Sequence, residues 1–416
     1  MKILHTADWH LGQKLYEKER YDEHQAFLDW LLQTINTEKI DLLLLAGDVF
    51  DTPNPPNKAM ELYYNFLAQL LHSHCQAAII VGGNHDSAFS LDAPKDLLKF
   101  MKLHIIGGAT ENIADELIEI KDEKGNILAV IAAVPFLRDK DIEYDKNNNG
   151  IAQREVQIVQ SISTHYKKLA DLITERKYAS NVPLLATGHL FAQGGSANSD
   201  DNNEDEDAER KIYMGSLGIV PPSAFTNVFD YVALGHLHRF QQVGGKNIYY
   251  SGSPIPLSFS ERKDEKMVIM IDFEGKNIKN IQALPVPTHL HKTLKRFEGT
   301  LTEVCQAITD FEVHTPTWAE VLLHLEQPTP NAHEIVLQTA HEKGNDFTLL
   351  RTKIESIQQQ NMTWATMLQQ SQRLQDLSAK DVFQQLCLEK GYTAEHLKNL
   401  LPLFDELVEM AKEGNS

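Results

Sequence analysis

Residues 79 to 87 read I-I-V-G-G-N-H-D-S, and this stretch decides how the rest of the chain is arranged. The apolar run that ends in Gly82-Gly83 predicts a buried strand leading into a tight loop, which presents Asn84, His85 and Asp86 together. An amide oxygen, an imidazole and a carboxylate in one loop offer a metal ligand beside a titratable acid. On these three residues alone, a polar turn after a strand is an equally good interpretation, so the other strand ends must decide.

Four further apolar strands are predicted to end in metal-ligand side chains. Those strands cover residues 2–7, 42–46, 183–187 and 231–234, and the side chains that follow or end them are Asp8 and His10, Asp48, His189, and His236 with His238. The carboxyl ends of parallel strands meet at one edge of a sheet, so we expect these groups to converge. Positions two apart in an extended chain point to the same side, which predicts that Asp8 and His10 reach one ion.

The donor set favours two ions rather than one. Carboxylate, amide and imidazole donors without a thiolate suit Mn²⁺, Fe or Mg²⁺ better than structural Zn²⁺. Seven donors fit two ions if one carboxylate is shared, and Asp48 is the natural bridge. Two such ions polarise phosphoryl oxygens and activate a water molecule for in-line displacement.

His85 is predicted to act on the substrate instead of binding an ion. If Asn84 coordinates, the adjacent His85 side chain points away from the metal and is free to donate a proton to the leaving oxygen or to stabilise charge on the phosphate. Either the Asp86 carboxylate or a backbone carbonyl would orient its ring. Asp51, three residues after Asp48, is expected to support the ligands from outside the metal shell.

The order of elements predicts an α/β fold. Helices are expected at 22–36, 58–72, 92–101 and 152–176, and strand–helix–strand order is typical of a sheet with parallel pairs. Strands at 248–252 and 266–273 are expected to close a second, antiparallel sheet. A boundary near residue 285 gives the domains 1–284, 285–356, 357–377 and 378–416, which are the main domain, a small α/β module, a linker and a helical hairpin.

Two apolar surfaces have alternative explanations. The stripe formed by Met60, Tyr63, Tyr64, Leu67 and Leu71 is either core packing or a dimer face. The hairpin at 378–416 is too small to bury its own apolar faces, so it docks either on this chain or on the helices of a partner. No G-x-x-x-x-G-K-[ST] motif occurs, so any ATP hydrolysis has to come from another polypeptide.

Composition narrows the class of protein. The 39 basic and 58 acidic residues give a net charge of -19, which argues against unaided, strongly electrostatic DNA binding. Charged and polar residues near the start, no apolar run of 18 residues and three scattered cysteines predict a cytoplasmic protein without a membrane span. The acidic stretch 196–210 is expected to be a solvated insertion rather than a regulatory or metal-collecting segment.

The complete motif series resembles a known family. Asp8-x-His10, Gly47-Asp48-x-x-Asp51, Gly83-Asn84-His85-Asp86, Gly188-His189 and Gly235-His236-x-His238 are similar to the motifs of the calcineurin-like metallophosphoesterases. The stretches ILHTADWHLGQ (3–13), HQAFLDWLL (24–32) and LAGDVFDT (45–52), followed by Pro55-Pro56, resemble the bacterial SbcD nucleases, prokaryotic relatives of the Mre-type DNA repair nucleases. The similarity covers about the first 270 residues well.

This resemblance implies a four-layer α/β/β/α core, a small α/β capping domain that binds DNA, and C-terminal helices that hold an SbcC-like ATPase. It also implies a homodimer formed through the helices near 58–72 and 92–101, and a nucleoid-associated enzyme of DNA repair, recombination and replication. One Mn²⁺ would take Asp8, His10, Asp48 and His238, the other would take Asp48, Asn84, His189 and His236, and His85 would be the catalytic histidine. The acidic insert departs from the family pattern.

Three functions remain open from the sequence. The first is a Mn²⁺-dependent DNA nuclease, acting as an exonuclease on double-stranded ends and as an endonuclease on single strands and hairpins. The second is a metallophosphoesterase of small phosphodiester or phosphomonoester substrates, which the metal motifs alone do not separate from the first. The third is a non-catalytic scaffold for an ATPase partner, which has no physical need to keep an intact donor set with His85.

Overall fold

The computed structural model describes residues 1–142, 151–196, 219–225, 227–245, 247–325, 329 and 331–356. The chain forms two compact units, the first from Met1–Lys295 with His314–Trp318 and the second from Arg296–Val313 with the residues from Ala319 onward. Residues 197–210 of the acidic insert, the predicted linker at 357–377 and the predicted hairpin at 378–416 lie outside the described residues.

The first unit contains two six-stranded sheets. The first sheet has the order β14-β13-β1-β4-β5-β6, in which β1, β4, β5 and β6 run parallel and the other two are antiparallel. Its strands are β1 (Lys2–Thr6), β4 (Leu42–Ala46), β5 (Ala77–Val81), β6 (Leu103–Ile106), β13 (Met267–Glu274) and β14 (Asn277–Pro285). A small two-stranded hairpin, β2 (Lys14–Leu15) and β3 (Lys18–Glu19), follows β1.

The second sheet has the order β11-β12-β10-β9-β8-β7, with β8, β9, β10 and β12 parallel. Its strands are β7 (Leu117–Lys121), β8 (Ile127–Ala132), β9 (Leu184–His189), β10 (Tyr231–Gly235), β11 (Gln241–Gln242) and β12 (Ile248–Tyr250). The prediction that residues 248–252 and 266–273 close one antiparallel sheet is wrong. β12 pairs in parallel with β10, whereas β13 crosses to the first sheet and pairs with β1, because both faces of the apolar run 267–273 are buried there.

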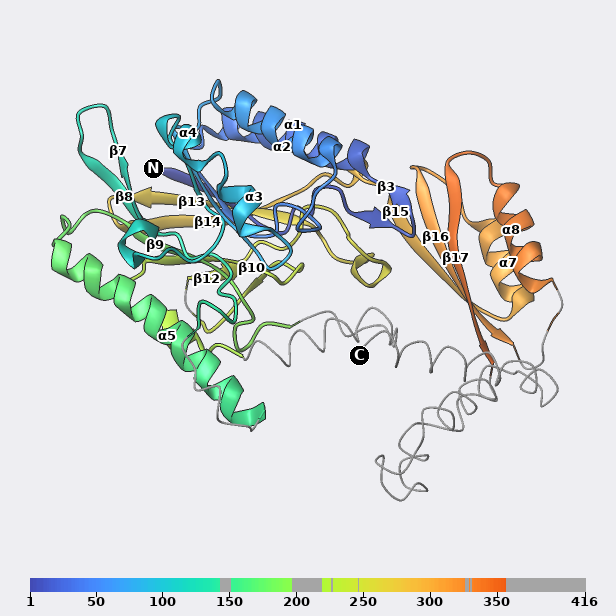
Figure 1. Ribbon diagram of the computed structural model, residues 1–416. Helices are drawn as coiled ribbons and strands as arrows, with labels where there is room; N and C mark the ends of the chain where they lie inside the picture. The colour runs from blue at the N-terminus through green and yellow to red at the C-terminus, as the bar shows by residue number, and fades with distance from the viewer. Residues whose placement is uncertain are drawn as a thin grey trace, which may run out of the picture. The chain divides into compact units, whose positions relative to one another are not determined.

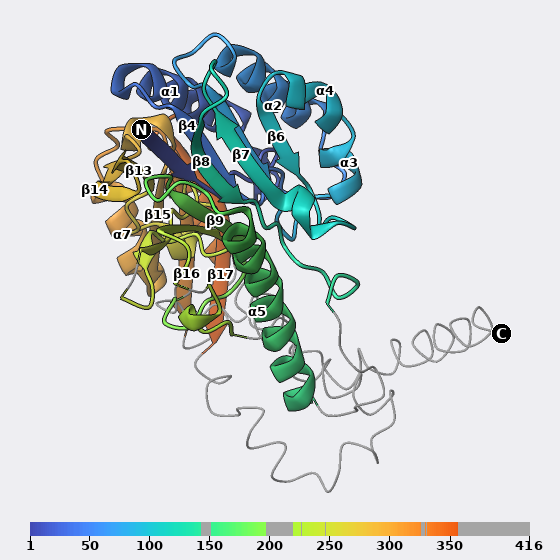
Figure 2. The ribbon, with the colours of Figure 1, turned by 90° about the vertical axis from the view of Figure 1, so that its left-hand side faces the viewer.

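Helices cover the outer faces of both sheets and give the predicted four-layer α/β/β/α arrangement (Figures 1 and 2). α1 (Tyr21–Glu38) and α2 (Asn57–Leu70) pack on the first sheet with the short α3 (Ala88–Asp92) and α4 (Lys95–Phe100), and α5 (Ile151–Arg176) packs on the second. Alternate residues of each central strand face opposite layers: Leu43 faces the helices, whereas Leu44 lies between the sheets. Burial on both faces explains why these strands are apolar throughout.

The apolar stripe predicted on residues 58–72 divides between core and surface. Tyr63 and Leu67 are buried against the first sheet, whereas Tyr64 and Leu71 are exposed. Core packing therefore explains only part of the stripe. None of the helices in the described part of the chain combines the length and the apolar character that crossing a membrane requires.

The second unit is a small α/β module. Its elements are β15 (Thr293–Gly299), α7 (Leu301–Asp310), β16 (Thr317–Leu325), α8 (Ala332–His341) and β17 (Phe347–Ser356), of which β15 and β16 begin in segments of the first unit. The sheet order is β15-β16-β17, and both helices cover one face of the sheet (Figure 1). Val321, Leu323, Val336 and Phe347 form its core. This alternation of strands and helices agrees with the α/β character predicted for residues 285–356.

His24 in α1 is a buried histidine that makes the fold sensitive to acid. Among the described residues, neither of its ring nitrogens has a hydrogen-bond partner. Burial and the nearby charge of Arg20 lower its pKa from 6.5 to about 3. Below pH 6.5, His24 therefore binds a proton in the unfolded chain but stays neutral in the folded chain. The free energy of unfolding falls as the pH drops from 6.5 towards 3.

Replacing His24 by leucine is expected to remove about 1.4 kcal/mol of this stability loss per pH unit between pH 6.5 and 4.5. At pH 7 the variant should be at least as stable as the parent, because it removes two unsatisfied buried polar atoms. Urea unfolding at pH 7, 6 and 5 measures both effects.

The control variant is H5L. Both ring nitrogens of the buried His5 are bonded, to Tyr231 Oη at 3.0 Å and to Leu234 O at 3.1 Å, so this substitution should cost stability at pH 7. An H24L protein that keeps the pH slope of the parent would contradict the assignment.

Candidate metal centre

Every metal-ligand side chain singled out in the sequence lies at the carboxyl ends of parallel strands of the first unit. The loops after β1, β4 and β5 supply donors from the first sheet, and the ends of β9 and β10 supply donors from the second. The structure brings together all seven predicted donors: Asp8, His10, Asp48, Asn84, His189, His236 and His238.

The backbone at four of these positions is left-handed. The φ angles are 53° at Asp8, 46° at His10, 50° at Asp48 and 100° at His236, a region that residues other than glycine rarely adopt. The expectation that Asp8 and His10 share one side of an extended strand is therefore wrong, since β1 ends at Thr6. Their side chains converge because the loop itself turns, held by Asp8 N–H to Gly47 O and His10 N–H to Asp48 O, each at 3.0 Å.

Two glycines allow the loops after β4 and β5 to pack closely. A Cβ atom at Gly83 would collide with the carboxylate and backbone of Asp48, and one at Gly47 would collide with the His189 ring. Gly47 also has a φ of 92°, which disfavours any side chain there. The glycines in the G-D and G-N-H-D motifs are therefore required by the approach of the ligands.

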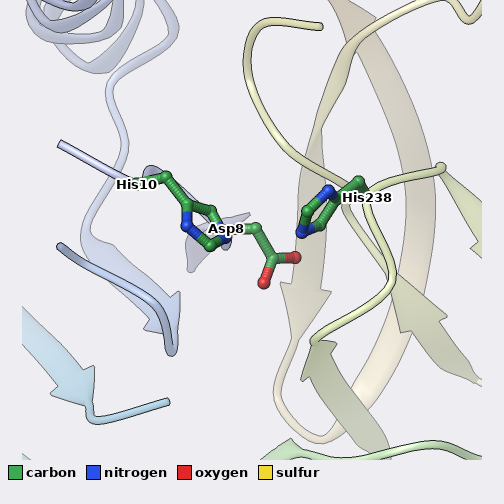
Figure 3. Close-up of side chains that lie close together, drawn as sticks. All are labelled: Asp8, His10 and His238. Carbon is green, nitrogen blue, oxygen red and sulfur yellow. The ribbon is translucent and has the colours of Figure 1, made fainter. Parts of the chain in front are cut away.

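Asp8, His10 and His238 form the first cluster (Figure 3). One ligand atom of each lies within 4.8 Å of the others. Asp8 Oδ2 and His10 Nε2 are buried, and neither has a hydrogen-bond partner among the described residues. Buried polar atoms without a hydrogen-bond partner are costly, so this cluster fits a cation that would satisfy them.

Asn84, His189 and His236 form the second cluster. The Asn84 Oδ1 atom lies 2.9 Å from His189 Nε2 and 3.2 Å from His236 Nδ1. Asp48 lies between the two clusters: its Oδ2 atom is 3.2 Å from His189 Nε2 and 3.5 Å from His10 Nε2. One carboxylate oxygen is therefore within reach of both.

The Asp48 carboxylate raises the pKa of two of the predicted histidine ligands. Burial lowers the pKa of His10, but the hydrogen bond to Asp51 and the charge of Asp48 outweigh it and raise the pKa to about 9. Burial also lowers the pKa of His189, but the charge and hydrogen bond of Asp48 outweigh it and raise the pKa to about 9. At His236, burial and the charge of His189 lower the pKa to about 3. A histidine must be neutral to bind a metal ion, so bound ions would replace the additional protons on His10 and His189.

His85 lies beside the first cluster, in a group with His10 and Asp51 whose ligand atoms are within 4.8 Å of one another, and it is exposed to solvent. Its ring lies 4.8 Å from the His10 ring, between centroids, and its Nδ1 is 2.8 Å from the backbone carbonyl of Asp51. A carbonyl can only accept, so Nδ1 donates and Nε2 is the nitrogen left to face a substrate. Of the two predicted ways of orienting this ring, the structure has the backbone carbonyl.

Asp86 and Asp51 have different roles from each other. The buried Asp86 carboxylate accepts hydrogen bonds from the backbone N–H groups of Val49, Phe50 and Gly83 at 2.9 to 3.0 Å, so it joins the loops after β4 and β5 and does not contact His85. The Asp51 carboxylate accepts from His10 Nδ1 at 3.1 Å. Asp51 thus orients one predicted ligand with its side chain and His85 with its backbone.

The sequence did not indicate Glu261 or Lys266. His238 Nδ1 lies 2.9 Å from Glu261 Oε1, and Glu261 Oε2 lies 2.6 Å from Lys266 Nζ. Residues 261–266 read E-R-K-D-E-K, which is typical of an exposed turn. Only the fold shows that the first and last members of this run are buried.

Comparisons with known proteins agree with this geometry. The calcineurin-like phosphoesterase family model matches residues 1–240, and the SbcD_C model, described as the type 5 capsule protein repressor C-terminal domain, matches residues 291–390. The chain is 34% identical over 394 residues to the SbcD subunit of the SbcCD nuclease of Escherichia coli K12, covering 94% of each chain.

Two other bacterial relatives carry the same name. The Rhodobacter capsulatus protein is 34% identical over 74% of this chain and 75% of its own length. The Bacillus subtilis protein is 31% identical over 65% of this chain and 66% of its own length. The chain belongs to the calcineurin-like phosphoesterases, within the family of SbcD nuclease subunits.

Proposed function

We propose that this protein is the nuclease subunit of an SbcC–SbcD-type complex that hydrolyses DNA phosphodiester bonds with two metal ions. The observation that carries the proposal is the convergence of seven donors from both sheets on one site that has buried, unpartnered ligand atoms among the described residues. Similarity to a nuclease subunit along 94% of the chain supports DNA as the substrate class. The activities expected are those of a double-strand exonuclease and a single-strand and hairpin endonuclease, in repair, recombination and replication on the cytoplasmic nucleoid.

We assign two Mn²⁺ ions to the two clusters, with Mg²⁺ or Fe as alternatives. The first would be held by Asp8, His10, Asp48 and His238, and the second by Asp48, Asn84, His189 and His236. When bound, two such ions polarise the scissile phosphate and activate water for in-line attack. The position of the Asp48 Oδ2 atom between the clusters supports its role as the shared ligand.

His85 is assigned the role of acid towards the leaving oxygen. The Asp51 carbonyl fixes its Nδ1 proton, so the group available to the substrate is Nε2, and only the imidazolium can donate from there. The exposed side chain leaves this face accessible to an extended polymer. Asp86 would act indirectly, because it keeps the loop that carries His85 beside the loop that carries Asp51.

We assign residues 1–284 to the nuclease domain and 285–356 to the DNA-capping domain. The linker at 357–377 and the hairpin at 378–416, which would bind an SbcC-like ATPase, lie outside the described residues. The similarity to the SbcD component of an SbcCD nuclease supports the ATPase partner.

The direct test is cleavage of linear duplex DNA by the full chain with Mn²⁺, alone and with the SbcC-like ATPase and ATP, beside a generic phosphodiester reporter. We expect Mn²⁺-dependent cleavage of the duplex that increases with the partner. Turnover of the reporter without any cleavage of DNA would favour the small-substrate phosphoesterase. No turnover of either would favour the scaffold.

We also propose a homodimer formed through α2, α3 and α4. Phe89 in α3 and Phe100 in α4 are 86% and 90% exposed, and Tyr64 of α2, Leu71 directly after α2 and Leu97 of α4 are exposed as well. Figure 2 shows these three helices on the same side of the first unit. Large aromatic side chains that are exposed to solvent are typical of a protein interface.

Replacing Phe100 by aspartate is expected to weaken dimerisation at least about 100-fold, because a two-fold interface would bury two unpaired carboxylates. Sedimentation velocity over a concentration series measures the effect. The control is V156D, which places the same charge on an exposed apolar position of α5. Equal dissociation constants for the F100D variant and the parent would exclude this surface as the interface.

A further inference from the structure

We propose that Glu261 and Lys266 are positioning residues that orient the His238 ring and strengthen binding at the first metal position. The inference rests on the proposed two-metal function and adds to it two residues outside the ligand set. In this proposal, the buried Glu261–Lys266 ion pair determines how tightly one of the two metal ions is bound.

The contact between Glu261 and His238 determines which ring nitrogen faces the metal position. Glu261 Oε1 lies 2.9 Å from His238 Nδ1 and, as a carboxylate paired with Lys266, can only accept. Nδ1 therefore carries a proton, and Nε2 presents the lone pair. In Figure 3 the His238 ring lies beside the Asp8 carboxylate and opposite His10. A carboxylate behind a metal-binding histidine fixes its tautomer and raises its basicity.

Glu261 is itself held firmly. It lies in a short 3₁₀ helix (Phe259–Glu261), and its side chain is 1% exposed. While Oε1 faces His238, Oε2 accepts from Leu257 N–H at 3.0 Å and from Ser253 Oγ at 3.3 Å, in addition to Lys266. A carboxylate with both oxygens occupied in this way has little freedom to turn away from the histidine.

Lys266 completes the arrangement. Its buried ammonium has three acceptors for its three protons: Glu261 Oε2 at 2.6 Å, Ser253 Oγ at 2.9 Å and the backbone carbonyl of His238 at 3.0 Å. One lysine therefore contacts both the backbone of His238 and the carboxylate that holds its ring. Lys266 directly precedes β13, so the first sheet supports a ligand that follows a strand of the second.

The support of the histidines differs between the two metal positions. His10 and His238, assigned to the first position, are each backed by a carboxylate, from Asp51 and Glu261. His189, assigned to the second position, has Nδ1 within hydrogen-bond distance of the neutral carbonyl of Ala46, at 3.0 Å, whereas the carboxylate oxygen nearest to Nδ1, Asp8 Oδ1, is 3.9 Å away. Carboxylate support makes an imidazole the stronger ligand, so Glu261 should affect the first ion and leave the second unchanged.

The test titrates metal-free protein with Mn²⁺ and follows free Mn²⁺ by electron paramagnetic resonance. We expect E261Q to weaken one of the two binding steps about 10- to 100-fold and to leave the other step unchanged. In a D8N background, which lacks the first position, adding E261Q should change nothing. The control is E116Q, since Glu116 is also a fully buried carboxylate bonded to a histidine, His165, at 2.6 Å, but lies outside the site.

A second variant keeps the test valid if E261Q leaves Lys266 unpaired and unfolds the protein. E261M/K266M removes both buried charges at similar volume and should fold, because an apolar pair can replace a buried ion pair. Thermal unfolding of each variant separates loss of structure from loss of metal.

The outcomes divide clearly. Unchanged affinity for both ions in E261Q, or equal weakening of both together with a lower melting temperature, overturns the positioning role while the nuclease assignment stands. Parent protein that binds no Mn²⁺ and cleaves no DNA overturns the proposed function and this inference together. The inference is supported if E261Q weakens one Mn²⁺-binding step, E116Q weakens neither, and E261Q adds no further weakening in the D8N background.

Discussion

Replacing Asp48 by asparagine is expected to reduce Mn²⁺ binding from about two ions to about none at concentrations that saturate the parent protein. The reason is the position of one oxygen: Asp48 Oδ2 lies 3.2 Å from His189 Nε2 and 3.5 Å from His10 Nε2, so both clusters lose the same negative charge. Turnover should fall below detection, because neither ion would be in place. Titration calorimetry and a duplex cleavage assay measure the two effects.

If Asp48 is shared between the two positions, its replacement should remove more metal ions than the replacement of any other proposed ligand. D8N should lose one ion, since Asp8 is assigned to the first position alone, and D48N should lose both. D230N is the matched control, because Asp230 also accepts a backbone N–H, from Leu184 at 2.9 Å, and is remote from the site. A D48N protein that retains one fully occupied position would show that Asp48 is not shared.

Replacing His85 by alanine is expected to lower the turnover of DNA cleavage by about 10²- to 10⁴-fold, the usual contribution of a positioned acid or base. Mn²⁺ stoichiometry should stay near two, because the His85 Nδ1 faces the Asp51 carbonyl at 2.8 Å and the ring is outside the proposed ligand set. The comparison of metal titration with turnover therefore separates binding from chemistry.

Two further variants sharpen the test of His85. H189A removes a buried histidine assigned as a ligand beside Asp48 and should lower both metal affinity and turnover. H72A removes an exposed histidine at the end of α2 and should change neither. Turnover of H85A equal to that of the parent would remove the proposed role, and loss of an ion in H85A would make the residue a ligand instead.

Much of the core could be predicted because burial of a strand or of one helix face requires apolar residues at a regular spacing in the local sequence. Strands buried on both faces must be apolar throughout, as in Leu42–Ala46 and Ala77–Val81, and the first polar residues beyond them mark the strand ends. Helix α5 follows from apolar residues at helical spacing, and its buried residues, among them Ile162, Tyr166 and Leu169, cover the second sheet.

Two features of the fold depend on contacts between distant residues. Periodicity shows that 267–273 is a buried strand, but the choice of β1 as its partner depends on which sheet edge is open. An exposed apolar stripe and a buried one have the same spacing, so the division of α2 into core and surface faces followed only from the packed sheet.

The sequence by itself determined the donor types and their positions at strand ends, because each depends on neighbouring residues. Only the tertiary structure decided how those donors approach: through left-handed backbone at Asp8, His10, Asp48 and His236, and through glycines that admit the Asp48 and His189 side chains. It also buried Glu261 and Lys266 behind His238 within a run that looks like an exposed turn. A buried charge is recognised by its partners, and those lie in segments that only folding brings together.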